Sequence, residues 1–143
     1  EGKTQLEYNR RYYQEILDVV KIYKDYSILG HLDVIKRYDK QGEIEFEKIK
    51  DLIEQIFEVV IADGKGIELN TSSRAYKLKS LMPSKEILKL YHDMGGKIIT
   101  IGSDAHNADR IGDCVMESQK ILKDIGFEGI YTFEKMKPEF HKL

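Results

Sequence analysis

Residues 97–106 read KIITIGSDAH, an apolar and β-branched run that changes abruptly to polar side chains. β-Branched residues favour extended backbone, so residues 97–102 predict a strand. Asp104 and His106 follow directly at its carboxyl end. Open α/β sheets and α/β barrels gather their ligands beyond the carboxyl ends of the strands, so this stretch predicts both a fold class and the place of a site.

The rest of the chain repeats the same order of a helix and then a short strand. Apolar spacing predicts helices over residues 6–24, 44–62, 84–94 and from 108 or 110 to 125, and further strands over residues 26–29, 67–70 and 129–133. Strands that alternate with crossover-length helices predict a parallel sheet in an α/β fold. Four such units are about half of an eight-stranded barrel, which needs about 250 residues, and an open four-stranded sheet is the alternative. The tail from Glu134 is polar, and we expect Pro138 to break any long continuation.

Composition places the chain among globular proteins of one domain. It has 143 residues, of which 41% are hydrophobic and 34% charged, and a net charge of −2. No basic excess suggests nucleic acid or an anionic membrane as a partner. The single cysteine, Cys114, excludes a disulfide within the chain, and no run approaches the roughly 20 apolar residues of a membrane span. We therefore expect a cytoplasmic protein.

The strongest local signal is the pair Asp104 and His106. Residues two apart on an extended segment point the same way, so a carboxylate and an imidazole would share one side. Oxygen and nitrogen donors in this arrangement make half of a metal site. The alternative is that Ser103 and Asp104 cap the following helix, and the two interpretations can coexist.

A second candidate is Gly30-His31-Leu32-Asp33, which closes the first strand. His31 could reach the same opening as a neutral imidazole ligand, and Asp33 could orient a histidine or take part in proton transfer. The alternative is a solvent-facing loop histidine, with Asp33 as the cap of a short helix.

A third candidate follows the second strand, where Asn70 ends the run and Arg74 lies four residues on. The planar guanidinium of arginine suits a phosphate group, so Asn70 and Arg74 are candidate substrate-binding residues. Arg110, near the start of the next helix, is a weaker candidate of the same kind. An ordinary surface arginine is the alternative for both.

Three motifs together resemble a known family. They are Gly30-His31-Leu32-Asp33, then Ile67-Glu68-Leu69-Asn70-Thr71-Ser72, then Gly102-Ser103-Asp104-Ala105-His106. In this order and spacing they resemble the C-terminal motifs of the polymerase-and-histidinol-phosphatase (PHP) family, and within it most closely the PHP-type histidinol-phosphatases. The resemblance runs from about Tyr8 to the end of the last helix.

The resemblance implies a distorted (β/α)7, TIM-like barrel that holds up to three divalent metal ions, usually zinc, iron or manganese. It implies His31, Asp104 and His106 as metal ligands, and Arg74 as a contact of the substrate phosphate. We expect Asp104 and His106 to take part in catalysis, and Asp33 to support proton transfer. The implied reaction is hydrolysis of a small phosphate ester, histidinol phosphate, to histidinol in histidine biosynthesis.

One family motif is missing, because no His-x-His occurs in the chain. In the family this pair opens the first strand and is followed by further His and Glu ligands. We therefore expect residues 1–143 to form a single partial barrel, the C-terminal half. Two alternatives stay open. The chain could be a non-catalytic half-barrel that pairs with the missing half or with a second copy as a homodimer, or it could serve another phosphate ester.

Overall fold

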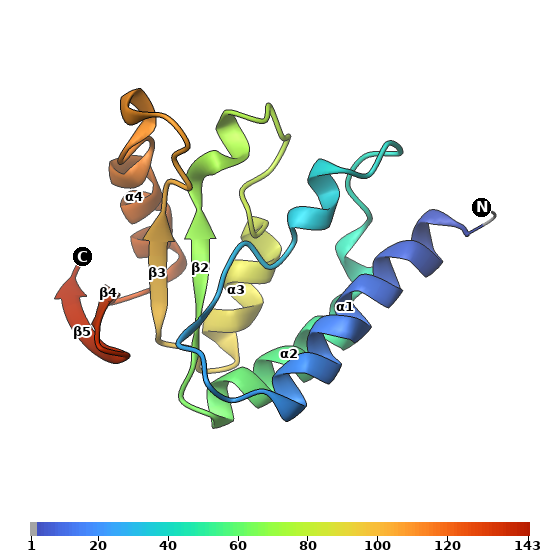
Figure 1. Cartoon of the computed structure of the whole chain (residues 1–143), viewed down its shortest axis with the longest axis horizontal. Coiled ribbons are helices and arrows are strands. Elements are labelled where there is room, and N and C mark those ends of the chain that lie inside the picture. Colours follow the sequence, from blue (N-terminus) through green and yellow to red (C-terminus); the bar gives the residue numbers. More distant parts are fainter. Residues whose placement is uncertain (1–2) are drawn as a thin grey trace.

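The structure, a computed structural model, describes residues 3–143 and has a three-stranded parallel sheet at its centre (Figure 1). The strands stand in the order β1 (Ile28–Leu29), β2 (Gly66–Asn70) and β3 (Ile99–Gly102). Both neighbouring pairs are parallel, as the alternating pattern predicts. The three strands therefore end at the same edge, the upper one in Figure 1.

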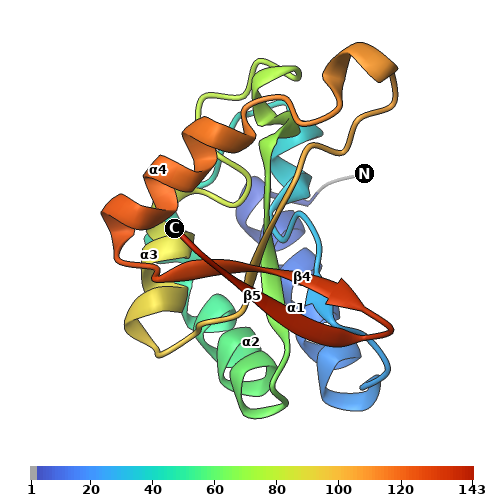
Figure 2. The same cartoon turned by 90° about the vertical axis from the view of Figure 1, so that its left-hand side faces the viewer.

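The helices form one layer against this sheet. They are α1 (Gln5–Ile22), α2 (Lys50–Ala62), α3 (Lys85–Asp93) and α4 (Val115–Ile125), and they contact one another in series. Figures 1 and 2 show α2, α3 and α4 on one face, with α1 continuing the layer beyond β1. Among the described residues, no helix covers the opposite face, and no helix is long and apolar enough to cross a membrane.

Short 3₁₀ turns fill the connections. η1 (Val34–Arg37), η3 (Thr71–Arg74) and η4 (Ala108–Arg110) each follow one of the three strands, and η2 (Phe46–Lys48) precedes α2. The helix expected from residue 44 therefore starts later, at Lys50, after a separate turn. Three of the four turns thus lie where strands leave the sheet, and they carry several of the candidate site residues.

Side chains set the starts of two helices. At α1, Glu7 donates its N–H to Thr4 Oγ1 at 3.2 Å, and Thr4 donates its own N–H to Glu7 Oε2 at 2.8 Å. At α3, the Ser84 hydroxyl accepts the Ile87 N–H at 3.4 Å, as the sequence predicts. Each cap satisfies backbone donors that a helix start leaves without a partner.

The start of α4 differs from the expectation. The apolar pattern predicted a helix from residue 108 or 110, but only the short turn η4 forms there and α4 begins at Val115. Gly112 (φ 76°) and Cys114 (φ 58°) have left-handed backbone, which cannot continue a right-handed helix. The predicted boundary was wrong because the spacing of apolar residues does not show whether a residue has positive or negative φ.

The fourth strand does not join the parallel sheet. β4 (Gly129–Glu134) pairs in antiparallel fashion with β5 (Lys137–Lys142), so the expected fourth parallel strand is wrong. The polar tail also continues through Pro138 as a strand, although Pro138 was expected to break it. Lys135 (φ 49°) and Met136 (φ 63°) form the tight turn, since two positive φ values match the twist of a two-residue hairpin. Figure 2 shows this hairpin crossing beside β3.

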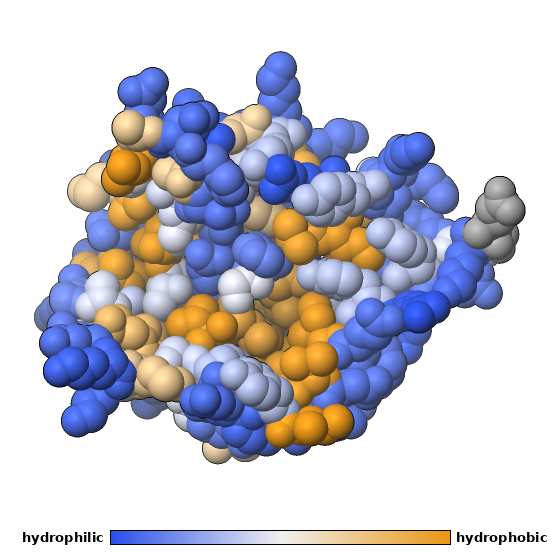
Figure 3. All heavy atoms as spheres, viewed as in Figure 1, coloured by the Kyte–Doolittle hydropathy of each residue, from blue (hydrophilic) through white to orange (hydrophobic). Residues whose placement is uncertain are grey.

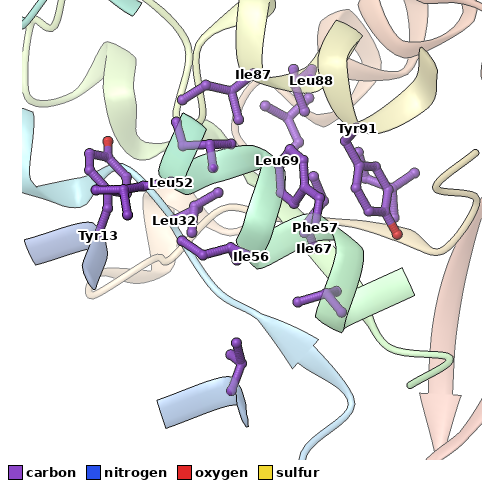
Figure 4. Close-up of a cluster of buried hydrophobic side chains, with 14 of the residues drawn as sticks. Tyr13, Leu32, Leu52, Ile56, Phe57, Ile67, Leu69, Ile87, Leu88 and Tyr91 are labelled. Atoms are coloured by element: carbon purple, nitrogen blue, oxygen red, sulfur yellow. The ribbon is translucent and has the colours of Figure 1, made fainter. Parts of the chain in front are cut away.

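The core lies between the sheet and the helix layer (Figure 4). Ile67 and Leu69 of β2 are fully buried, and they meet α2 and α3 residues such as Phe57 and Tyr91. The Phe57 and Tyr91 rings pack edge to face with centroids 5.0 Å apart. Burying a side chain of this size stabilises the fold by about 1.5–3 kcal/mol, so this cluster fixes the sheet against the helices.

Alternation along β2 puts polar side chains on the other face. Since Ile67 and Leu69 turn to the core, Glu68 and Asn70 lie on the face without a helix. Figure 3 shows this face, which has apolar surface at its centre and polar residues around it. Leu29 and Ile101 are among the partly buried apolar side chains of the strands.

Candidate functional site

At the carboxyl edge of the sheet, the chain leaves each strand through a polar residue. His31 lies two residues after the end of β1, Asn70 ends β2, and Asp104 lies two residues beyond β3. His31 and Asp104 are exposed, whereas Asn70 is 1% exposed. The three strand ends that the sequence predicted to share one opening are therefore adjacent, in the order β1, β2, β3.

Two of these residues have unusual backbone. His31 (φ 30°) and Asp104 (φ 47°) are non-glycine residues with positive φ. Such conformations cost of order 1–3 kcal/mol each and persist only where the surrounding structure imposes them. Their occurrence at two strand ends of one edge marks this edge as the candidate site.

Glu68 lies between these two strand ends, and the sequence reasoning did not single it out. Its Oε2 atom accepts the backbone N–H of His31 at 2.9 Å and the side-chain Nδ2–H of Asn70 at 3.2 Å. Its Oε1 atom lies against Gly102, where a Cβ atom would be only 2.1 Å away. A charged residue inside an apolar strand was the available signal, since such a residue faces away from the core.

His106 has one ring nitrogen fixed. Its Nδ1 atom lies 2.9 Å from the carbonyl oxygen of Asp104. A carbonyl can only accept, so Nδ1 is the donor in this contact, and in the neutral imidazole the lone pair then lies on Nε2. Histidines that bind metals use this arrangement, in which the second nitrogen donates to a backbone carbonyl.

The capping alternative for Asp104 is not what the structure shows. Asn107 precedes η4, and Cys114 precedes α4, so neither following helix starts at Asp104. The neighbouring Ser103 hydroxyl accepts the Gly112 N–H at 3.3 Å and so holds the loop after β3. Asp104 is exposed, and the group of Asp104 that contacts the His106 ring is its backbone carbonyl.

The predicted ligands do not form a finished metal site in this chain. Within residues 3–143, no three His, Cys, Asp or Glu side chains are grouped so that they could hold an ion. The order of the sheet gives the reason, because β2 separates His31 from Asp104 and two strand spacings amount to about 10 Å. His106 lies against the Asp104 carbonyl, but Asp104 has a φ of 47°, so the extended segment that was expected to put both side chains on one side does not form. His31 lies on the other side of Glu68.

The Asn70 amide is engaged within the protein. Its Oδ1 atom accepts the Ser72 N–H at 3.0 Å, and its Nδ2 donates to Glu68. This contact starts the turn η3, which carries Arg74. In the structure Asn70 orders the end of β2 through these two hydrogen bonds. Substrate binding by Asn70 stays a prediction.

Arg74 is exposed and points to the start of α4, where its Nη1 donates to the Cys114 sulfur at 3.2 Å. Cys114 therefore contacts an arginine at a helix start. Arg110, on η4, has a buried Nη2 atom with no hydrogen-bond partner among the described residues. Both arginines lie in segments that follow β2 and β3, and phosphate binding by them stays a prediction.

Asp33 is buried away from solvent, at 2% exposure. Its Oδ2 atom accepts from Lys36 Nζ at 2.8 Å and from the Ser84 N–H at 3.0 Å. Burial raises the pKa of Asp33, while Lys36 and the Ser84 N–H act in the opposite direction. These contacts tie η1 to the start of α3, so a catalytic role for Asp33 stays a prediction without a contact that favours it.

Comparison with known proteins decides the family. Residues 1–72, just over half of the chain, match the model of the PHP domain. The chain belongs to the PHP family. The resemblance that the three strand-end motifs suggested is thereby confirmed.

Relatives of this PHP chain include several histidinol-phosphatases. A probable histidinol-phosphatase of Thermotoga maritima is 36% identical over 119 residues, which cover 83% of this chain and 49% of the relative. The histidinol-phosphatase of Lactococcus lactis is 30% identical over 143 residues, which cover 98% of this chain and 52% of the relative. The chain thus spans about half the length of the curated relatives it matches.

A solved structure is also similar. It is the crystal structure of histidinol phosphate phosphatase from Lactococcus lactis complexed with zinc, L-histidinol and phosphate. The match has a TM-score of 0.81 and 28% identity, and it covers 96% of this chain and 52% of that one. Almost the whole PHP chain therefore has the backbone arrangement of about half of that protein.

Proposed function

We propose that this PHP chain supplies the C-terminal half of the active site of a metal-dependent histidinol-phosphatase, which hydrolyses histidinol phosphate to histidinol and phosphate. The observation that carries the proposal is the carboxyl edge of the sheet. There His31, Glu68, Asp104 and His106 lie at three adjacent strand ends, in a fold shared with a phosphatase that binds zinc, histidinol and phosphate. A cytoplasmic location stays a prediction.

The donors at this edge fit a divalent metal ion. His106 holds Nδ1 against the Asp104 carbonyl, which leaves Nε2 for a ligand, and Asp104 itself is exposed. Nitrogen and carboxylate donors suit zinc, iron or manganese. His31 would add an imidazole on the other side of β2. When bound, such ions lower the pKa of a coordinated water and offset charge on a phosphoryl group.

The remaining candidates would hold the substrate. The exposed Arg74 offers a guanidinium whose planar donors match phosphate oxygens, and Arg110 offers a second on η4. Asn70 and Asp33 would act indirectly, by fixing η3 and η1 through the contacts described above. In this proposal the chain's own residues bind and orient the phosphate ester.

The completed active site would belong to a TIM-like (β/α)7 barrel, of which this chain forms about half. The helix layer lies on one face of the sheet, as on the outside of a barrel, while the opposite face carries apolar surface and β1 is an edge strand (Figure 3). Further strands, from the missing half or from a second copy in a homodimer, would cover that face and add ligands.

A second candidate follows from the coverage of about half of each relative. The chain alone would then be a non-catalytic half-barrel, active only when paired. A different phosphate ester as substrate is an alternative within the same site.

The test uses the protein that carries this chain, supplied with zinc and assayed with histidinol phosphate. We expect His106→Ala to lose bound zinc and to lower turnover by at least about 100-fold, since a ligand is removed. His141→Ala is the matched control, because His141 is exposed on β5 and its side chain hydrogen-bonds to Thr132 on the neighbouring strand of the hairpin. Unchanged zinc content and rate in His106→Ala would overturn the proposal.

A further inference from the structure

We propose that Glu68 is a positioning residue for His31. Its carboxylate, on β2, fixes the left-handed backbone at the end of β1 and so sets the direction in which the His31 imidazole enters the site. The inference rests on the proposed function, in which His31 binds a metal ion.

The first support is a continuous set of hydrogen bonds that ends at His31. The Ser72 N–H fixes the Asn70 amide at 3.0 Å, the Asn70 amide donates to Glu68 Oε2 at 3.2 Å, and the same oxygen accepts the His31 N–H at 2.9 Å. Asn70 is 1% exposed and Ser72 is fully buried, so this support for the carboxylate is rigid. The end of β2 thereby determines the backbone at the end of β1.

The second support is the backbone conformation that the contact holds. His31 has a φ of 30°, which is strained for a non-glycine residue and persists only where neighbouring groups impose it. The Glu68 oxygen that accepts the His31 N–H is such a group, and without an acceptor at this place the His31 backbone would relax toward negative φ.

The third support is the space that the glycines leave. A Cβ atom on Gly102 would lie 2.1 Å from Glu68 Oε1, whereas a Cβ atom on Gly30 would lie 3.5 Å from Oε2, an ordinary contact. Neither glycine has positive φ, so alanine can adopt the backbone at both positions. Gly102→Ala therefore displaces the Glu68 carboxylate by steric pressure, without changing Glu68 or His31 chemically.

The expected size of the effect comes from metal sites in general. Groups that orient a metal-binding histidine change metal affinity by about 10–100-fold when they are removed. Here the orienting group would act on the histidine backbone. Glu68 Oε1 accepts no hydrogen bond from the rest of residues 3–143, so this oxygen could instead bind the metal directly. The experiment must distinguish that role from the positioning of His31.

The experiment is an NMR titration, with zinc chloride, of the protein that carries this chain, followed at the His31 backbone amide and imidazole resonances. The variants are Glu68→Gln, Glu68→Ala and Gly102→Ala, with Gly30→Ala as the matched control. Glutamine keeps the acceptor oxygen and loses the charge. We expect Glu68→Ala and Gly102→Ala to move the His31 amide resonance and to weaken zinc binding at its imidazole about tenfold or more. Glu68→Gln and Gly30→Ala should stay within about threefold of the parent.

Two results would overturn the inference. An unchanged His31 amide in both Glu68→Ala and Gly102→Ala would show that the carboxylate does not hold this backbone. Zinc binding as weak in Glu68→Gln as in Glu68→Ala would show that the charge acts directly. If Glu68→Ala fails to fold, Gly102→Ala decides. Zinc that leaves the His31 imidazole unperturbed in the parent protein would instead refute the proposed metal site, and the amide data would still report on the Glu68 contact.

Discussion

The buried pair Asp33–Lys36 gives a prediction whose size follows from the structure. The Lys36 and Asp33 side chains are 5% and 3% exposed, and Nζ lies 2.8 Å from Oδ2. Lys36 also donates to Glu43, Ser80 and the Leu81 carbonyl, so it joins η1 to the segment before α3. Lys36→Met keeps the length of the side chain but leaves a buried carboxylate without its cation.

Breaking a buried ion pair from one side costs about 3–5 kcal/mol, because the remaining charge is left without compensation. We expect that loss in the free energy of unfolding for Lys36→Met. Asp33→Asn should cost less, because Lys36 keeps its other three acceptors. In the double variant no uncompensated charge remains at the Asp33 position, so its cost should fall below the sum of the single costs by about 1–3 kcal/mol.

Urea unfolding followed by circular dichroism measures these changes, since the chain has no tryptophan for fluorescence. With a slope of about 2 kcal/mol per molar urea, Lys36→Met should lower the midpoint by about 1.5–2.5 M. Lys89→Met is the control, because its pair with Asp93 is exposed and such pairs contribute below about 1 kcal/mol. A loss under about 1 kcal/mol for Lys36→Met, or additive single effects, would refute the reasoning.

Three further outcomes are expected. Arg74→Met should raise KM for histidinol phosphate about tenfold or more, because it removes a guanidinium that binds the phosphate. The unfolding midpoint should not change, because Arg74 is exposed. A KM equal to that of the parent would show that Arg74 does not bind the substrate. Phe57→Ala should cost about 3–5 kcal/mol in urea unfolding, because Phe57 is fully buried, and a loss below about 1 kcal/mol would contradict the described core. Burial alone would raise the pKa of Asp39, but hydrogen bonds from Asn9, Gln41 and Gln5 together lower it. The ionised Asp39 therefore stabilises the fold above about pH 4, and this stabilisation is lost as the pH falls through the pKa of Asp39 in the folded protein. In urea unfolding, the difference in stability between the parent and Asp39→Asn should shrink between about pH 5 and about pH 3.

Periodicity predicted the part of the fold in which local pattern and burial agree. The strands near residues 67 and 99 and the helix that Ser84 caps are found close to their predicted bounds, because one buried face determines each of them. The hairpin of β4 and β5 was missed because its turn, Lys135 and Met136, has none of the Asn or Gly residues that signal positive φ. Its second strand is exposed and so shows no apolar alternation.

The candidate site was predictable to a similar degree. Strand ends of a parallel sheet meet at one edge, so the sequence sufficed to place His31 and Asp104 there. It could mark Glu68 only as a charged residue that faces away from the core, because the role of that carboxylate depends on the approach of His31 and Gly102 from two other strands. Nor could it show that Asp33 is buried against Lys36, since this contact forms only when η1 packs on the start of α3.

Whether this edge of the sheet binds metal is tested most directly by anomalous diffraction from zinc-loaded crystals of the protein that carries the chain. We expect a zinc peak at about 2.0–2.2 Å from His106 Nε2 and from an Asp104 oxygen, and a zinc ion bound by the His31 imidazole. Zinc peaks confined to other parts of the protein, with none within bonding distance of these three side chains, would contradict the account.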